Sequence, residues 1–327
     1  MEYRTLGRTG LRVSAIGFGC GNTGGLMVRG EPAEQRAAVE RALAGGITYF
    51  DTAAQYGEGR SEENLGRVLR ELQADVLVGT KVRLVPEEVP DAAAALRRKL
   101  EEGLRRLGRE RVDVCTLHNP TLLGDGARGL PVDAVLGPVG EGMQALRAAG
   151  LCHFVGFSGL GDTPALQRVA SAGIFDTLQC YYNAINPSAG YPGSPDGVAQ
   201  DFDGLLDRAA AAGLGVFAIR ILAGGAAVAT PERHPTAGAG SALAQGTDYV
   251  RDVARAAALR ALAAELGLEG PLELAFRFAL AKQGISCALI GPSSVAHVED
   301  ALRWEARGPL SAEAVARVLA LARPAAA

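Results

Sequence analysis

The chain has 327 residues, of which 48% are hydrophobic and 21% are charged, and its formal net charge at pH 7 is −3. This length and hydrophobic content allow a large core, and α/β barrels often run this long as one domain. The small net charge argues against a nucleic-acid-binding surface or a polybasic membrane patch, and the longest apolar run, residues 209–219, is too short to span a bilayer.

The first segment of the chain, residues 1–10 (MEYRTLGRTG), is polar and lacks the apolar centre of a signal peptide. The five cysteines are widely spaced and none forms a CxxC pair. These two features predict a cytoplasmic protein with buried thiols and with neither a disulfide framework nor a zinc site. Residues 3–14 are typical of a hairpin of two short strands around residues 7–10, which would close the bottom of a barrel.

Beyond the hairpin, short β-rich runs alternate with amphipathic helical patterns. Strands are predicted at 14–18, 47–51, 76–80, 112–117, 153–157, 177–179, 215–219 and 287–290. Helices are predicted at 32–44, 61–72, 91–107, 139–149, 163–171, 202–212 and 274–282, with another after the last strand. Several helical patterns end in glycine, which takes the left-handed C-cap conformation before a following strand.

Strands that alternate with helices imply a parallel sheet with crossover connections. Eight such units close into a (β/α)₈ TIM barrel, here predicted as a single domain over residues 1–327. An open doubly wound sheet is the alternative. It would use a GxGxxG turn after the first strand, and the segment GFGCGN at 17–22 matches that pattern only in part.

Two predicted connections are unusually long, residues 180–200 after the sixth strand and residues 222–248 after the seventh. Long loops inside a compact domain are usually functional. Both leave the carboxyl ends of strands, where barrel enzymes keep their active sites, so we expect them to form the walls of a substrate site. The second loop contains His234, which is either a substrate contact or a solvated loop residue.

Polar side chains follow the apolar strands of the predicted barrel. The catalytic candidates among them are Asp51, Tyr56, Lys81 and His118. Each residue alone has an ordinary interpretation: a helix cap, a packed aromatic, a surface charge and a structural histidine. Their position at the ends of consecutive strands instead predicts that they meet at one rim of the barrel.

These residue types suit the protonation of a carbonyl oxygen. A charge that loses hydration needs a partner, so Lys81 is expected to pair with Asp51. The lysine should lower the pKa of Tyr56 well below ~10, which makes the phenol an acid–base group. Neutral His118 can donate its ring N–H to a carbonyl oxygen. The sequence contains no evident metal-ligand cluster or activated nucleophile, so the group that adds to the carbon is predicted to be a hydride from a bound cofactor.

Several segments resemble the aldo-keto reductase superfamily, and the resemblance covers nearly the whole chain. They are LGRTGLRVSAIGFG (6–19), FDTAAQYGEGRSEENLGRVL (50–69), VGTK (78–81), TLHNP (116–120) and ALIGPSSVAHVEDAL (288–302). The resemblance implies a barrel that binds NADP or NAD without a Rossmann domain.

The resemblance also implies a role for individual residues. Tyr56 would be the general acid–base, Lys81 would tune it, Asp51 would hold Lys81, and His118 would orient the substrate carbonyl. The cofactor-binding positions would be Ser158, Gln179, Arg220, Leu222, Gly291, Ser293, Ser294, His297 and Asp300. Of these, Ser158 and Gln179 would hold the nicotinamide carboxamide, and Gly291, Ser293 and Ser294 would receive the cofactor phosphate at a helix N-terminus.

Two departures from the family pattern affect the nicotinamide. Gly159 stands where an asparagine is common, so one carboxamide contact is absent or is made through water. Ile219 stands where an aromatic usually stacks on the ring. The nicotinamide would then rest on an aliphatic side chain, or Tyr181 or Tyr182 would take the place of the aromatic. Arg220 beside it would bind the pyrophosphate or pair with an acid.

A third departure concerns the choice between NADP and NAD. Relatives that prefer NADP hold its 2′-phosphate with a lysine and an arginine, and the matching positions here are Gly291 and His297. Neither residue carries a fixed positive charge, whereas phosphate recognition favours Arg or Lys. We therefore expect NAD to bind comparably to NADP, or better.

The predicted function is an NAD(P)-dependent oxidoreductase that transfers a hydride between nicotinamide and an aldehyde or ketone, or the corresponding alcohol. One alternative is an aldose 1-dehydrogenase that oxidises a sugar. Another is a non-catalytic, cofactor-sensing regulatory subunit, which the absence of a long N-terminal interaction segment disfavours. The expected partner is a small carbonyl or sugar substrate, without nucleic acid or membrane, and the oligomeric state is open.

Overall fold

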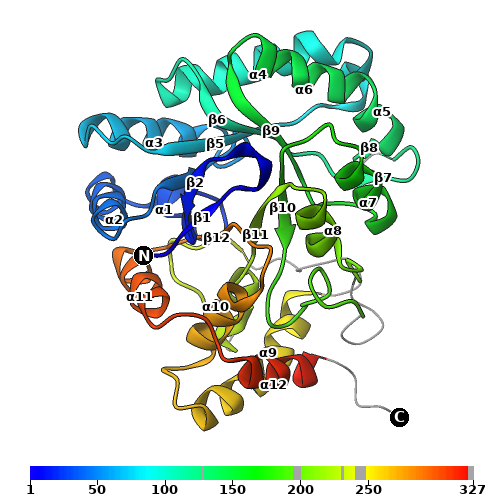
Figure 1. The fold of residues 1–327 in the computed structure, drawn as a ribbon. Helices are drawn as coiled ribbons and strands as arrows, with labels where there is room; N and C mark the ends of the chain where they lie inside the picture. Colours follow the sequence, from blue (N-terminus) through cyan, green and yellow to red (C-terminus); the bar gives the residue numbers. More distant parts are fainter. Residues whose placement is uncertain (127–128, 194–199, 230–231, 240–247, 323–327) are drawn as a thin grey trace.

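A closed barrel of eight parallel strands forms the centre of the molecule, in the order β10-β11-β12-β3-β4-β5-β6-β9 (Figure 1). The computed structural model describes residues 1–126, 129–193, 200–229, 232–239 and 248–322. The last strand, β12, pairs with the first barrel strand, β3, and so closes the ring. The predicted (β/α)₈ barrel is confirmed.

The barrel strands fall where the sequence places them. They are β3 (Ile16–Gly19), β4 (Tyr49–Asp51), β5 (Leu77–Val82), β6 (Val112–Leu117), β9 (Cys152–Ser158), β10 (Thr177–Tyr181), β11 (Gly215–Ile219) and β12 (Cys287–Ile290). The first predicted strand, 14–18, is divided in the structure. Ser14 ends a strand of the N-terminal hairpin, and the barrel begins at Ile16.

Helices surround the barrel. They are α1 (Leu26–Arg29), α2 (Pro32–Ala44), α3 (Arg60–Glu71), α4 (Ala92–Leu107), α5 (Val132–Leu136), α6 (Pro138–Ala148), α7 (Thr163–Ser171), α8 (Leu205–Ala211), α9 (Tyr249–Glu265), α10 (Pro271–Ala281), α11 (Val295–Ala306) and α12 (Ala312–Ala322). The sequence pattern did not predict α9 and α12, nor the short helices α1 and α5. The helices α9, α10 and α12 lie together at the lower end of Figure 1 and contact one another.

The N-terminal hairpin closes one end of the barrel, as predicted. Its strands β1 (Tyr3–Thr5) and β2 (Arg12–Ser14) pair antiparallel and are joined by the 3₁₀ turn η1 (Gly7–Thr9). Leu6 and Val13 are fully buried and pack with Tyr49 and Phe217 in the lower barrel core. The hairpin therefore excludes water from the end of the barrel at which the strands begin.

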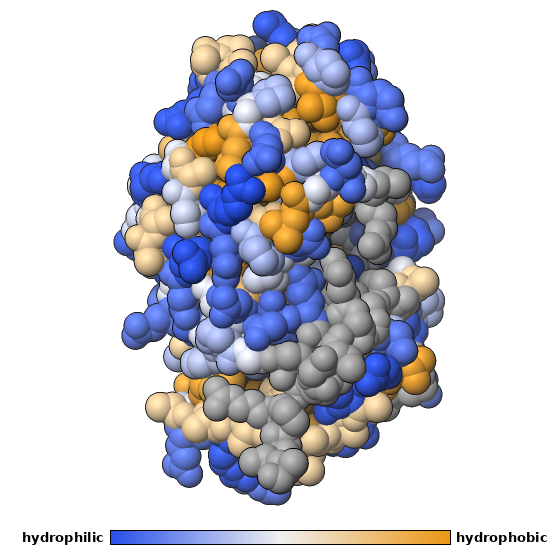
Figure 2. Space-filling model, turned by 90° about the vertical axis from the view of Figure 1, so that its right-hand side faces the viewer, coloured by the Kyte–Doolittle hydropathy of each residue, from blue (hydrophilic) through white to orange (hydrophobic). Residues whose placement is uncertain are grey.

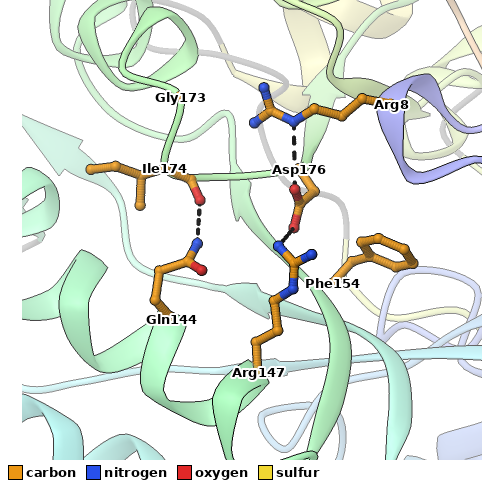
Figure 3. A pocket seen from close by; sticks show the side chains of 7 residues that line it. All are labelled: Arg8, Gln144, Arg147, Phe154, Gly173, Ile174 and Asp176. Atoms are coloured by element: carbon orange, nitrogen blue, oxygen red, sulfur yellow. Dashed lines mark hydrogen bonds and ion pairs between the residues drawn. The ribbon is translucent and has the colours of Figure 1, made fainter.

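A cavity of about 520 Å³ lies at this same end, beside the hairpin. Figure 3 shows Arg8 of the hairpin and Arg147 of α6 converging on the carboxylate of Asp176, each at 3.5 Å. Asp176 also accepts a hydrogen bond from the backbone N–H of Val155. This cavity thus contains a structural ion pair that ties the hairpin to the barrel.

Within the residues that the structure describes, no helix is both long and apolar enough to cross a membrane. On the face shown in Figure 2, hydrophobic residues gather mainly in the upper half of the view, with hydrophilic residues between them.

The hairpin contact predicts unequal effects of two alanine substitutions. Gly7 and Gly10 both have left-handed backbone conformations, with φ of +48° and +72°. A Cβ atom on Gly7 would lie 2.2 Å from the backbone nitrogen of Gly215, whereas one on Gly10 meets nothing within 4 Å. We expect Gly10→Ala to lower the free energy of unfolding by about 1 kcal/mol, from backbone strain alone, and Gly7→Ala to lower it by roughly 3 kcal/mol. Urea unfolding measures both, and equal losses would contradict the proposed packing of the hairpin.

Candidate active site

A buried ion pair lies at the carboxyl end of the barrel strands. Asp51 is the last residue of β4, and Lys81 lies in the neighbouring strand β5. The ammonium of Lys81 donates to Oδ2 of Asp51 and, at 2.8 Å, to the backbone oxygen of Thr52. Only 1% of the Lys81 side chain and 6% of the Asp51 side chain is exposed, so the pair is almost fully desolvated. The predicted pairing of these two residues is present.

The charge state of the pair follows from this arrangement. Burial lowers the pKa of the Lys81 ammonium, but Asp51 and Tyr56 raise it by more, so its pKa lies above the ordinary value. Burial raises the pKa of the Asp51 carboxyl, while the Lys81 ammonium and the Gln179 amide oppose that rise. Lys81 therefore stays protonated at neutral pH.

Tyr56 lies beside this ion pair, in the loop between β4 and α3. The Nζ atom of Lys81 is 4.8 Å from the centre of the Tyr56 ring. The expected lowering of the Tyr56 pKa is wrong: burial raises the pKa of the phenol by more than the Lys81 ammonium lowers it, and Asp51 adds to the rise. The physical reason is that a phenolate loses its hydration in this buried site, and that cost outweighs its attraction to the Lys81 ammonium. Tyr56 is thus protonated at neutral pH.

His118 completes the predicted group of four. It follows β6, and its ring meets the Tyr56 ring edge-on with the centres 5.8 Å apart. Burial, together with the positive charges of Lys81 and Arg83, lowers the pKa of His118 to about 3. The imidazole is therefore neutral at physiological pH, as expected. The structure brings all four predicted residues to one mouth, while their catalytic roles stay predictions.

Ser158 and Gln179 lie next to the ion pair, Ser158 at the end of β9 and Gln179 within β10, and they are partners in the strand register. Nε2 of Gln179 donates to Oδ1 of Asp51 at 2.5 Å, a contact that the sequence did not predict. The hydroxyl of Ser158 is buried and has no hydrogen-bond partner among the described residues. A buried polar atom without a partner is costly, so this hydroxyl suits a bound group that is polar. The two residues therefore fit the carboxamide of a nicotinamide.

The predicted phosphate segment joins β12 to α11. Ser294 is the N-cap of α11, and its side chain makes no capping hydrogen bond, so it is available to an anion. The backbone N–H of Ser293 donates to Nδ1 of His297 at 3.1 Å, so one of the expected phosphate donors is engaged within the loop. Gly291 lies close to Gly24, where a Cβ on Gly24 would be 2.3 Å from the Gly291 oxygen.

The remaining cofactor candidates are Asp300 of α11, and Arg220 and Leu222, which follow β11. Asp300 accepts a hydrogen bond from Arg303 at 2.6 Å, which ties its carboxylate to its own helix. Arg220 has a left-handed backbone with φ of +57°, and its guanidinium lies 5.7 Å from the centre of the Tyr181 ring. Leu222 is half-buried and precedes the 3₁₀ helix η3 (Ala223–Val228).

The structure separates the two tyrosines that the sequence left open as stacking partners. Tyr182 is fully buried and stacks on Phe278 of α10, so its candidacy is wrong. Tyr181 is half-buried at the end of β10, near Arg220 and close enough to Tyr56 to affect its pKa. Tyr181 therefore remains the aromatic candidate beside the nicotinamide position.

The two long loops are described only in part, because residues 194–199, 230–231 and 240–247 lie outside the described residues. The ring of His234 packs against that of His297, with 5.6 Å between their centres. His234 thus lies at the phosphate segment. The expectation that the loops form substrate walls stays a prediction.

Comparison with known proteins decides the family. The model described as "Aldo/keto reductase family" matches residues 15–323. The chain belongs to the aldo/keto reductase family. It is therefore an oxidoreductase, and the family implies small substrates of the carbonyl or sugar type.

Individual known proteins resemble the chain to different extents. The L-galactose dehydrogenase of Arabidopsis thaliana is 29% identical over 309 residues, which are 92% of this chain and 86% of that protein. The pyridoxal 4-dehydrogenase of Microbacterium luteolum is 46% identical, but only over 27% of this chain and 26% of its own length. Among solved structures, the holo form of aldo-keto reductase AKR11C1 from Bacillus halodurans matches with a TM-score of 0.74 at 21% identity, over 99% of this chain and 97% of its own. An aldo/keto reductase from Klebsiella pneumoniae in complex with NADP and acetate matches with a TM-score of 0.70 at 24% identity, over the same fractions.

Some residues that support this aldo/keto reductase site escaped the sequence analysis. Glu62 of α3 is fully buried and accepts hydrogen bonds from Thr80, which precedes Lys81, and from Arg106 of α4. Asn22 accepts a hydrogen bond from the backbone of Gly57, beside Tyr56. Gln55 contacts His118. The sequence places Glu62 and Gln55 near the motif, but it gives no signal for their partners, which come from distant segments.

The buried ion pair predicts a pH-dependent loss of stability. In Lys81→Met, Asp51 is left buried without its cation, which costs roughly 3 to 5 kcal/mol near neutral pH. The pKa of Asp51 then rises further above the value of ~3.9 in the unfolded chain, so the folded variant is favoured as pH falls and disfavoured as pH rises. Urea unfolding should therefore show a larger deficit against the unsubstituted protein at pH 8 than at pH 5.

The double variant Asp51→Asn/Lys81→Met is the matched control, because it leaves no unpaired buried charge. It should regain part of the lost free energy of unfolding and lose most of the pH dependence. A single variant whose deficit does not change with pH would contradict a charged Asp51–Lys81 pair.

Proposed function

We propose that this chain is an NAD(P)(H)-dependent enzyme that reduces an aldehyde or ketone to the alcohol and catalyses the reverse oxidation. The observation that supports this most strongly is the position of Tyr56 and His118 at one mouth, beside the desolvated Lys81–Asp51 pair. A nicotinamide cofactor, when bound, supplies or accepts the hydride at the carbonyl carbon. Ser158 and Gln179 would hold its carboxamide, with the unpartnered Ser158 hydroxyl as the structural support for that role.

The protein side chains then orient the carbonyl oxygen and supply the proton that it receives. Neutral His118 orients the carbonyl oxygen, and Tyr56 donates its phenolic proton to that oxygen as negative charge develops there. The adjacent Lys81 ammonium stabilises the phenolate that remains until a proton returns from solvent. Burial raises the pKa of Tyr56, so the phenol holds its proton at neutral pH and can act as the acid in the reduction.

A second candidate function is aldose 1-dehydrogenase activity on a sugar, with Tyr56 as the base that removes the anomeric hydroxyl proton. It is favoured by the similarity, over most of the chain, to a relative named L-galactose dehydrogenase, and by a partial match to the D-threo-aldose 1-dehydrogenase of a Pseudomonas species. Assays of NAD(P)H oxidation with aldehydes and of NAD(P)⁺ reduction with sugars would separate the two candidates.

The third candidate function is a cofactor-sensing regulatory role. A probable voltage-gated potassium channel subunit beta from rice matches 37% of the chain.

Replacement of the proposed acid tests the enzyme hypothesis. We expect Tyr56→Phe to lower kcat by roughly 10² to 10⁴, because only the transferable proton is lost. Affinity for NADPH, followed by fluorescence, should change little, since the ring remains in place. A variant with unchanged turnover would contradict the role of Tyr56, and a protein without turnover on any carbonyl or sugar but with tight NADPH binding would favour the sensor.

The phosphate segment leads to a prediction about cofactor choice. Neither Gly291 nor His297 carries a fixed charge, and burial, together with neighbouring His234, lowers the pKa of His297. We therefore expect NADPH to bind less than about a hundredfold more tightly than NADH at pH 8. The preference for NADPH should grow as pH falls, because protonation of His297 adds a positive charge. Because the pKa of His297 is lowered, both cofactors are titrated at pH 5 and pH 8, with NADH as the internal control. A preference for NADPH above about a hundredfold at pH 8 would rule the hypothesis out.

A further inference from the structure

The proton on the ring of His118 has a specific neighbour in this chain. The pKa of His118 is low, so the imidazole is neutral and carries one proton, on either Nδ1 or Nε2. A carbonyl oxygen needs an N–H donor, so only the tautomer with its proton on the nitrogen facing the substrate can orient a carbonyl. The identity of the group at the other nitrogen therefore matters for the reaction.

The neighbour at Nδ1 is the side-chain amide of Gln55, whose Oε1 atom lies 3.0 Å away. Gln55 immediately precedes Tyr56 and belongs to the same loop, so it approaches His118 from the β4–α3 side of the mouth. The charged groups that lower the pKa of His118 are Lys81 and Arg83, both from the β5 segment, and both are cations. Neither cation can accept a proton from the ring, and the amide of Gln55 is the hydrogen-bond partner that the structure gives to Nδ1.

A glutamine amide can satisfy Nδ1 in two ways. With its oxygen toward the ring it accepts from Nδ1–H, which leaves Nε2 without a proton. With its NH₂ toward the ring it donates to Nδ1, which leaves the proton on Nε2. The side chain of Gln55 is exposed and lines a cavity of about 290 Å³, so a half-turn of the amide exchanges its two ends without moving the backbone.

We propose that Gln55 is a positioning residue that assigns the ring proton of His118. Its amide presents Oε1 to Nδ1 in the structure, and we infer that in solution it is turned by half, so that its NH₂ donates to Nδ1 and Nε2–H donates to the substrate oxygen. The role of the ring proton in catalysis rests on the proposed carbonyl reduction. The contact between Gln55 and His118 does not depend on that proposal. A carboxylate at position 55 could only accept, so it would hold the proton on Nδ1 and stabilise the imidazolium. An apolar residue would leave the tautomer to the solvent.

The first experiment requires no turnover. Two-bond ¹H–¹⁵N correlation spectra of the ¹⁵N-histidine-labelled full chain distinguish the two neutral tautomers and the imidazolium, and His118→Asn identifies the His118 signal. We expect the unsubstituted protein to populate the Nε2–H tautomer of His118. In Gln55→Glu this neutral tautomer should be replaced by the Nδ1–H form and, at lower pH, by the imidazolium. Identical ring signals in the unsubstituted protein, Gln55→Leu and Gln55→Glu, or no Nε2–H form in the unsubstituted protein, would overturn the proposal.

The second experiment measures kcat/KM for carbonyl reduction against pH. Gln55→Leu should lose about tenfold, the value of one hydrogen bond, with its NADPH affinity unchanged. In Gln55→Glu, kcat/KM should fall at least as much near pH 8. It should rise again as pH falls, because the imidazolium carries a proton on Nε2. The unsubstituted protein should show no such recovery, and a Gln55→Glu profile parallel to it would contradict the assignment.

A matched control is Gln283→Glu, an exposed glutamine in the turn before β12, which makes the same change of charge away from the mouth. It should leave the His118 spectrum and the pH profile as they are. If no carbonyl is reduced by any form of the protein, the proposed function fails, while the spectra still decide whether Gln55 controls the ring proton.

Discussion

The site depends on the ion pair between Lys81 and Asp51, because it places an ammonium in a position from which water is almost excluded. A lysine that is 1% exposed is stable there only with a partner and with its remaining protons donated, and Asp51 and Thr52 supply these acceptors. The adjacent strands β4 and β5 fix both residues at one end of the barrel. Tyr56 then has a fixed cation, the Lys81 ammonium, beside its ring.

The rest of the barrel can be understood as support for this pair. Glu62 anchors Thr80, the residue before Lys81, through a hydrogen bond from inside the helix layer. Gln179 donates to the free oxygen of Asp51 from the opposite side of the barrel. At the far end, the N-terminal hairpin fills the opening with Leu6 and Val13, which keeps the lower core dry. Each of these contacts limits the movement of β4 and β5, and so holds the distance between Lys81 and Tyr56.

The sequence predicted the features that depend on local pattern. Alternating strand and helix patterns with terminal glycines were sufficient for all eight barrel strands and for the bounds of α2 and α7. The helices α9 and α12 were missed because they lie outside the regular strand–helix alternation, one after a long loop and one at the end of the chain. The four catalytic candidates could be grouped because strand ends in a parallel barrel meet at one rim. Gln179 could be placed near them, but not its hydrogen bond to Asp51, since that depends on the side-chain conformation.

The pKa of Tyr56 shows why the proximity of a lysine was insufficient to predict the direction of the pKa shift. The sequence placed a lysine near a phenol, and in water such a cation lowers the phenol's pKa. In the structure burial penalises the phenolate by more than the lysine stabilises it, and the nearby Asp51 adds to the rise in pKa. Burial and ion pairing depend on the folded structure, so the direction of the Tyr56 pKa shift could not be predicted from the motif. The structural result suits a site in which the phenol holds its proton until negative charge develops on a substrate oxygen, because the Lys81 ammonium then stabilises the phenolate only when that proton has moved.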